Sequence, residues 1–268
     1  MESLGGRRVR VAAQVAPQHA TWQQISDAVR RVEDLGVDIV FNWDHFYPLT
    51  GDPDGAHFEA WTMLAALAES TERVELGTLV NCTIFRNADL QADMARTIDH
   101  ISGGRFIFGT GAGWFEREFD EYGYPYGTPG QRLDTLESDL HRIRARWGKL
   151  NPPPVRPIPV LIGGKGEQKT LRIVAEHADI WHSFVEPEAY QQKAAVLARW
   201  CETVGRDVSE IEFASGTGPR GQGSLDFDYL DRQHEVGVTL FSTHVMGPEF
   251  DDSGVRRLLE WRASRGLS

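Results

Sequence analysis

Short apolar runs alternate with segments of helical periodicity along the chain. The first apolar run covers residues 9–16, and the periodic segment after it has Thr21 as a candidate N-cap and Gly36 as a C-terminal stop. Apolar positions recur in this segment at helical spacing, at Trp22, Ile25, Val29 and Val32. The pattern predicts a strand followed by an amphipathic helix.

The same unit of strand and helix recurs along the rest of the chain. Further strands are expected at residues 37–43, 74–81, 105–111, 159–164, 179–184, 211–218 and 237–245. The helices that follow them are marked by the segment Glu59–Ala68, by Leu90, Met94 and Ile98, by Leu133, Leu136, Leu140 and Ile143, by Leu171 and Val174, by Leu197 after Pro187, by the segment Leu225–Glu235, and by Val255, Leu258 and Leu259. Together with the first pair, the pattern predicts eight units.

These units indicate the fold class. Strands that are apolar on both faces and alternate with helices form parallel sheets, because crossover helices cover both faces. Eight units in 268 residues predict an α/β fold, a closed (β/α)8 TIM barrel, with a single domain over residues 1–268. A doubly wound open sheet is the alternative, but the chain lacks the early GxGxxG turn typical of it.

Composition and charge indicate which kinds of partner and which cellular compartment to expect. The chain holds 28 Lys and Arg against 39 Asp and Glu, a formal charge of −11, which disfavours nucleic-acid binding. The N-terminal apolar run contains Gln14 and stops at Pro17, too short for a signal sequence or a membrane span. We therefore expect a cytoplasmic protein in which Cys82 and Cys201 are reduced structural thiols.

The carboxyl ends of the expected strands carry polar or glycine-rich sequence, and in a barrel these ends form the site. The second strand runs into Trp43, Asp44 and His45, a carboxyl group and an imidazole that suit proton or hydride chemistry. The alternative is that Asp44 caps the next loop while His45 only packs. The fourth strand ends in glycines at 109, 111 and 113, which allow a close approach to the backbone but equally suit a tight turn.

The turn after the fifth strand has the character of an anion site. Gly163, Gly164 and Gly166 surround Lys165 just before a helix, so backbone N–H groups, the helix dipole and a side-chain cation all favour a phosphate there. A glycine-rich turn without a ligand is the alternative.

Several segments, taken in order, resemble the luciferase-like family of flavin and deazaflavin oxidoreductases. They are FNWDHFYPL, VELGTLVNCTIFRN, HISGGRFIFGTGAGWFEREFDEYG and IPVLIGGKGEQKTLRIVAEHADIW, and the likeness is strongest from Val37 to Phe184. They look most like the branch that depends on the deazaflavin coenzyme F-420, which is common in actinobacteria. The resemblance implies a (β/α)8 barrel, in agreement with the strand count.

The resemblance also implies a set of site residues. Asp44 and His45 would be the catalytic residues beside the central ring of the cofactor, with His45 donating or accepting a proton. A non-proline cis peptide would fall at or beside Leu79–Val80, behind the cofactor ring. The implied cofactor-binding residues are Asp44, Leu79, Val80, Asn81, Gly111, Ala112, Gly113, Trp114, Gly163, Gly164, Lys165 and Gly166. Trp43, Trp114, His182 and His244 are expected around the substrate, and no metal is expected.

The chain departs from the family pattern in three places. The family's sugar-phosphate dehydrogenases have a catalytic Glu where this chain has Trp114, Lys165 replaces a glycine, and the insertion after the fourth helix is shortened to residues 149–159. Glu118 is expected to pair or cap within its own helix, in an acidic stretch on the solvated surface. Where the third helix begins, the simpler interpretation is Asn87 as an N-cap, and the functional one is Arg86 as a second anion contact.

The resulting hypothesis is an oxidoreductase that transfers a hydride between coenzyme F-420 and a small organic substrate, with His45 handling a proton. The principal alternative is a monooxygenase that uses FMN and a separate flavin reductase, because both cofactors carry a tricyclic ring and a ribityl phosphate. Two more distant alternatives are a barrel hydrolase with a metal bound by Asp44, His45, His57 and His244, and a cofactor-binding protein without catalytic activity. We also expect a homodimer with a small-molecule substrate and with neither nucleic acid nor membrane as a partner.

Overall fold

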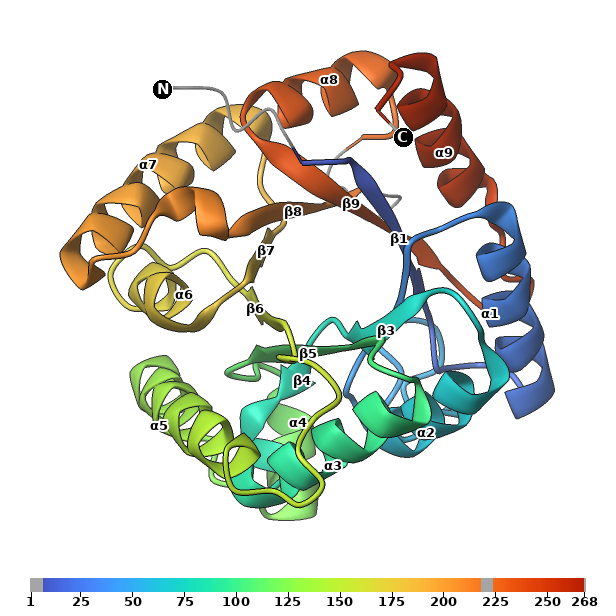
Figure 1. Ribbon diagram of the computed structural model, residues 1–268. Coiled ribbons are helices and arrows are strands. Elements are labelled where there is room, and N and C mark those ends of the chain that lie inside the picture. The colour runs from blue at the N-terminus through green and yellow to red at the C-terminus, as the bar shows by residue number, and fades with distance from the viewer. Residues whose placement is uncertain (1–6, 218–223, 268) are drawn as a thin grey trace.

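The computed structural model describes residues 7–217 and 224–267, and these form a closed parallel barrel with helices around it (Figure 1). The strand order is β3-β2-β1-β9-β8-β7-β6-β5-β4, and an additional pairing of β3 with β5 closes the ring. Every strand pairing is parallel. The predicted α/β TIM barrel is therefore confirmed.

The elements follow the predicted alternation. In the first half they are β1 (Arg10–Val15), α1 (Trp22–Leu35), β2 (Ile39–Asn42), α2 (Ala60–Ser70), β3 (Glu75–Thr78), β4 (Asn81–Cys82), the 3-10 turn η1 (Thr83–Phe85), α3 (Ala88–Ile101), β5 (Phe106–Gly111), α4 (Glu116–Tyr122) and α5 (Pro129–Trp147). In the second half they are β6 (Val160–Gly163), α6 (Thr170–His177), β7 (Ile180–Ser183), α7 (Pro187–Val204), the 3-10 turn η2 (Val208–Glu210), β8 (Glu212–Thr217), α8 (Phe227–Glu235), β9 (Val238–Val245) and α9 (Ser253–Ser264).

Local signals explain where the helices begin and end. Thr21 and Gln24 form a capping box at the start of α1, and Gly36 ends the helix in the left-handed conformation with φ of 100°. Thr128 and Gln131 form a second capping box at the start of α5, where Pro129 occupies the first turn. Both starts lie one residue after the threonine, as these motifs require.

The core has two layers. Side chains that point into the barrel form a small interior cluster of Ala12, Ile39, Phe41, Leu79, Ile107, Leu161, Ile180, Ala214 and Leu240. A much larger cluster fills the space between the strands and the surrounding helices. Burial on both faces is the reason that the strands read as continuous apolar runs.

The structure corrects the sequence pattern at a few points. Leu90 was expected on the buried face of its helix, but its side chain is 52% exposed. The third strand is interrupted after Thr78 and resumes as β4, and the short helix α4 was not predicted. Residues 149–159 form a loop between α5 and β6. Gly218, expected at the end of a strand, lies outside the described residues.

No helix in the described part of the chain is both long enough and apolar enough to cross a membrane.

Candidate functional site

A cavity of about 930 Å³ opens at the carboxyl ends of the strands, within the range of small-molecule sites. Nearly all the residues expected around a ligand line it, namely Trp43, Asp44, His45, Leu79, Val80, Asn81, Gly111, Ala112, Gly113, Trp114, Gly163, Gly164, Lys165, His182 and His244. Gly166 is not among the lining residues. Gln14, Cys82, Arg132, Thr170 and Phe184 also line the cavity, although the sequence did not lead us to expect them around a ligand.

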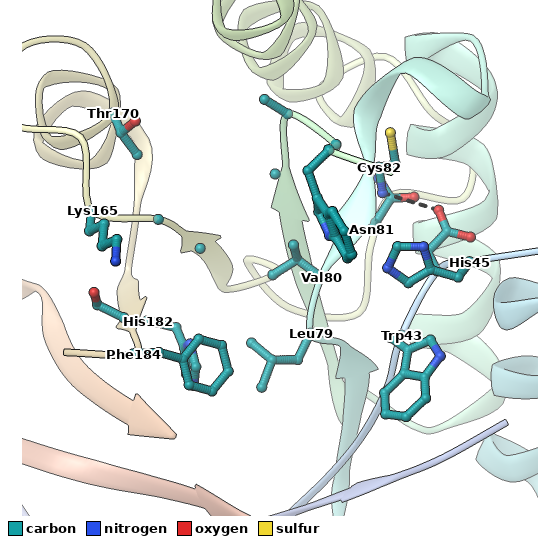
Figure 2. A pocket seen from close by; sticks show the side chains of 18 of the residues that line it. Trp43, His45, Leu79, Val80, Asn81, Cys82, Lys165, Thr170, His182 and Phe184 are labelled. Atoms are coloured by element: carbon teal, nitrogen blue, oxygen red, sulfur yellow. Dashed lines mark hydrogen bonds between the residues drawn. The ribbon is translucent and has the colours of Figure 1, made fainter. Parts of the chain in front are cut away.

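The cavity has two sides, and a central wall lies between them (Figure 2). Trp43 and His45 lie on one side, Lys165 and Thr170 on the other, and Leu79 and Val80 between them. The arrangement places a titratable imidazole and a cation at opposite sides of one cavity.

The wall between the two sides is the Leu79–Val80 peptide, which is cis, as the resemblance implied. Gln14 Nε2 donates a hydrogen bond to the Leu79 carbonyl at 2.6 Å. A Cβ on Gly111 would lie 2.9 Å from Val80 Cγ2, and one on Gly163 would lie 3.1 Å from Val80 Cγ1. The Val80 side chain therefore occupies space that two neighbouring strands leave open by carrying glycine.

His45 is held by a buried carboxylate. Its Nδ1 lies 2.8 Å from Glu118 Oε2, and the Glu118 side chain is fully buried. The other oxygen, Oε1, accepts hydrogen bonds from the backbone N–H groups of Phe46 and Tyr47. Because a carboxylate only accepts, Nδ1 carries a hydrogen and Nε2 is the nitrogen left for a ligand.

The position of Glu118 differs from the one expected from the sequence. It was expected within its own helix on a solvated acidic surface, yet it reaches across to the loop after β2 and is 0% exposed. It does not line the cavity, so it acts through His45. The local sequence showed only an acidic stretch, and no spacing signal connects residues so distant along the chain.

Asp44 is a buried residue of the cavity lining, and Arg86 binds its carboxylate. Arg86 donates from Nη1 to Oδ2 at 2.7 Å and from Nη2 to Oδ1 at 2.9 Å, and the Cys82 N–H donates to Oδ2 at 3.1 Å. Burial raises the pKa of the Asp44 carboxyl, while the Arg86 guanidinium and the Cys82 N–H oppose the rise. Both oxygens are thus engaged in supporting the loop.

Arg86 is therefore not a free anion contact. Its other partners are Asn81 Oδ1, which lies 3.3 Å from Nη1, and Glu59. Glu59 also caps α2 by accepting from the N–H groups of Trp61 and Thr62. Asn87 caps α3 as expected. The side chain of Asn81 likewise belongs to this support, because it bonds to Trp61 and Gln91.

Two aromatic groups flank His45. The Trp114 ring centroid lies 5.7 Å from the imidazole in an edge contact, and Trp114 stacks on Phe115 at 5.4 Å. Trp114 is 61% exposed, a large amount for a side chain that lines a cavity. It leaves a broad apolar face available to a bound molecule at the mouth.

The opposite wall combines imidazoles with Phe184. His182 Nε2 lies 3.0 Å from Ser242 Oγ, and the Phe184 ring lies 4.7 Å from His182 and 6.5 Å from His244. Burial, with a smaller effect of His244, lowers the pKa of His182 to about 3. His182 is therefore a neutral wall residue at physiological pH.

The four residues of the hydrolase alternative do not form a metal site. Trp43 Nε1 donates to His57 Nε2 at 3.2 Å, and burial together with His45 lowers the pKa of His57 to about 4. Asp44 and His45 are bound to Arg86 and Glu118. In residues 7–217 and 224–267, three potential metal ligands converge only at His141, Glu176 and His177, none of which lines the cavity.

The turn between β6 and α6 forms the cationic side of the cavity. Gly164 has φ of 138°, and its N–H donates to the His182 carbonyl at 3.1 Å. Helix α6 begins at Thr170 without a side-chain cap. Lys165 is exposed, makes no ion pair within the described residues, and directs its ammonium group into the cavity (Figure 2). These groups suit an anion.

Comparisons with known proteins agree with this architecture. A secondary alcohol dehydrogenase that depends on coenzyme F-420 has a TM-score of 0.82 at 17% identity, covering 95% of this chain and 98% of that chain. The F-420-dependent tetrahydromethanopterin reductase of Methanopyrus kandleri has a TM-score of 0.70 at 17% identity, covering 96% and 98%. EDTA monooxygenase of Chelativorans sp. BNC1 has a TM-score of 0.80 at 13% identity, covering 97% and 95%. At these identities the likeness shows the fold.

Sequence comparison is more specific. An uncharacterized protein of Mycobacterium tuberculosis strain H37Rv is 30% identical over 216 residues, 72% of this chain and 73% of that protein. Pyrimidine monooxygenase RutA of Enterobacter sp. strain 638 is 29% identical over 188 residues, 62% of this chain and 48% of that protein. The family model described as luciferase-like monooxygenase matches residues 7–219. The chain therefore belongs to the luciferase-like monooxygenase family.

Proposed function

We propose that this protein is an oxidoreductase that depends on coenzyme F-420 and acts on a small organic molecule, as a cytoplasmic homodimer. The observation that carries the proposal is the buried Glu118 carboxylate on His45 Nδ1, which holds an imidazole at the edge of a cofactor-sized cavity. Family membership supports redox chemistry in that cavity, and the F-420-dependent structural neighbours share its fold.

The cavity has the features that a tricyclic cofactor with a phosphate side chain requires. Leu79 and Val80 offer an apolar wall for a flat ring, and Gly111, Ala112 and Gly113 line the cavity at the end of the neighbouring strand. Lys165 and the uncapped start of α6 supply positive charge for a phosphate. When bound, the deazaflavin ring would supply the hydride chemistry.

His45 is the residue that moves a proton in this proposal. Glu118 holds hydrogen on Nδ1, so that Nε2 accepts a proton in the neutral imidazole and donates one in the charged form. Asp44 positions the loop that carries His45 by binding Arg86, and it does not exchange a proton itself. Trp43, Trp114, His182 and His244 shape the space for the substrate.

An FMN-dependent monooxygenase is the second candidate, because a pyrimidine monooxygenase is among the relatives that match by sequence. The two cofactors would use the same anion site, so the cavity alone does not separate them. The rings of the two cofactors differ, so binding measurements and the reaction with a reductant distinguish an F-420-dependent enzyme from an FMN-dependent one.

The deciding experiment titrates the purified protein with coenzyme F-420 and with FMN, following absorbance and fluorescence. We expect F-420 to bind at least tenfold more tightly, which corresponds to about 1.4 kcal/mol. Single-turnover reduction of bound F-420 by a panel of small alcohols then tests catalysis. Equal or tighter binding of FMN, together with oxygen consumption on addition of a flavin reductase, would establish the monooxygenase instead.

A further inference from the structure

Two histidines and a glutamate meet where α5 packs beside α6, outside the ring of strands (Figure 1). Their potential ligand atoms, one from each of His141, Glu176 and His177, all lie within 4.8 Å of one another. His141 belongs to α5, and Glu176 and His177 are the last two residues of α6. The two imidazole rings are nearly perpendicular, with centroids 4.5 Å apart. Two imidazoles and a carboxylate are a ligand set that proteins use for zinc.

The His177 side chain is buried, and one of its ring nitrogens lacks a partner. The residue is 4% exposed, and Nε2 makes no hydrogen bond in the part of the chain that the structure describes. Glu176 Oε2 lies 3.7 Å from this nitrogen, too far for a hydrogen bond. A buried polar atom without a partner is costly, whereas Nε2 of an imidazole is a common metal ligand. A metal ion between the three side chains would remove this cost.

Glu176 is held so that one of its carboxylate oxygens stays available. Arg172, one turn earlier on α6, donates to Glu176 Oε1 at 3.0 Å and to the two carboxylate oxygens of Glu137 on α5 at 2.6 and 2.7 Å. Oε2 of Glu176 accepts no hydrogen bond within the described residues. Partners that fix the orientation of a ligand are typical of metal sites. The Glu137 carboxylate also neutralises the charge of Arg172, which weakens its repulsion of a cation.

The cluster lies at the end of α6 that is far from the cavity. Thr170 begins α6 and lines the cavity, whereas the other end of the helix leads into the beginning of β7. The carboxyl end of a helix carries the negative end of its dipole, which favours a cation near Glu176 and His177. Arg144 Nη2, on α5, donates to the His177 carbonyl at 2.5 Å and ties the two helices together there. The three potential ligands are thus held in place by contacts between α5 and α6.

From this arrangement we propose that His141, Glu176 and His177 bind a zinc ion that links α5 to α6, with the remaining coordination position open to solvent beside the exposed His141. The inference does not rest on the proposed function, because the cavity and its cofactor take no part in it. Zinc is favoured over magnesium because Mg²⁺ prefers oxygen ligands and keeps several waters.

Calorimetric titration with ZnCl₂ of the full chain, without a histidine tag and after treatment with a chelator, tests the inference. We expect the wild type to bind one Zn²⁺ ion per chain, and we expect His141→Ala and Glu176→Gln to raise the Kd for zinc at least about tenfold. Neither side chain is buried, so both variants should fold, unlike variants of the buried His177. His100→Ala is the matched control, because His100 is an exposed helical histidine outside the cluster.

Thermal unfolding supplies a second measurement. Zinc should raise the Tm of the wild type and of His100→Ala but not that of His141→Ala, and Mg²⁺ at the same concentration should raise none of them. Absence of zinc binding by the wild type, or wild-type affinity in both His141→Ala and Glu176→Gln, would overturn the inference. Cofactor affinity should be the same with and without zinc, so failure of this inference and failure of the proposed function are distinguishable.

Discussion

Glu118 and His45 are 73 residues apart in the chain, yet Oε2 of one lies 2.8 Å from Nδ1 of the other. The second carboxylate oxygen accepts from two backbone N–H groups, so the carboxylate cannot turn away without leaving those donors unpaired. Glu118 is a positioning residue for His45, and it determines which ring nitrogen carries hydrogen.

Replacing Glu118 by Gln should impair catalysis more than binding. The side-chain oxygen of Gln is needed by the N–H groups of Phe46 and Tyr47, so the NH2 group would face His45 Nδ1 and force hydrogen onto Nε2. We expect kcat to fall by roughly 10² to 10⁴, the range for lost general acid–base catalysis, with little change in the cofactor Kd.

Steady-state kinetics and cofactor titration measure the two effects of Glu118→Gln. Glu116→Gln is the control, since Glu116 lies on the same helix but is exposed. A Glu118→Gln protein that is folded and has wild-type kcat would show that the tautomer of His45 does not matter for the reaction.

Removing the imidazole distinguishes a proton-transfer role from a lining role. His45→Ala should lower kcat of the saturated complex by roughly 10² to 10⁴ and leave cofactor affinity nearly unchanged. His141→Ala, at an exposed position outside the cavity, should change neither quantity. Wild-type turnover by saturated His45→Ala would reduce His45 to a residue of the cavity wall.

Lys165 should contribute to affinity and not to turnover. Its ammonium group points into the cavity and makes no ion pair within the described residues, so Lys165→Ala removes attraction for an anionic side chain without leaving a buried partner behind. We expect the cofactor Kd to rise about three- to tenfold at low salt and less at high salt. Lys149→Ala, on the exposed loop after α5, is the control. An unchanged Kd at low salt would place the anion elsewhere.

The Asp44–Arg86 pair should matter mainly for stability. Arg86→Met would leave the buried Asp44 carboxylate with only the Cys82 N–H as a partner, at a cost of about 3 to 5 kcal/mol in the free energy of unfolding. Arg142→Met breaks an exposed ion pair with Asp89 and should cost less than about 1 kcal/mol. Urea denaturation measures both, and similar small losses would mean that the buried pair carries no special weight.

Buried histidines should make the protein less stable in mild acid. Burial lowers the pKa of His182 to about 3, and of His57 and His177 to about 4. The unfolded chain takes up protons near pH 6.5, where the folded protein does not, so the free energy of unfolding falls as the pH drops below 6.5. Each such group contributes a slope of up to about 1.4 kcal/mol per pH unit.

His182→Gln should flatten this slope between pH 6 and pH 4.5 by up to about 1.4 kcal/mol per pH unit, because one proton fewer separates the unfolded from the folded state. The exposed His100 provides the control variant, His100→Gln, whose slope should match the wild type. Urea denaturation at several pH values measures the slopes. A His182→Gln protein with the wild-type slope would show that His182 becomes protonated without unfolding.

Much of the fold was readable from the sequence because its signals are local. Apolar periodicity indicates which face of one element is buried. The caps Thr21 and Gly36 lie directly before and after the helix that they delimit. Counting the repeated units was then enough to predict the barrel, and the barrel predicted that the site lies at the carboxyl ends of the strands. The family motifs added the cis peptide at Leu79–Val80.

Only the tertiary structure decided which groups the polar side chains bind. Arg86 binds Asp44 and not a ligand, Glu118 reaches His45, and Arg132 arrives at the cavity wall from a helix whose sequence showed only its apolar face. No local period relates such residues, since each pair depends on how two loops or helices meet over the end of the barrel. The sequence therefore determined the elements and the end of the barrel that carries the site, while the closing of the chain in space determined which charge lies against which.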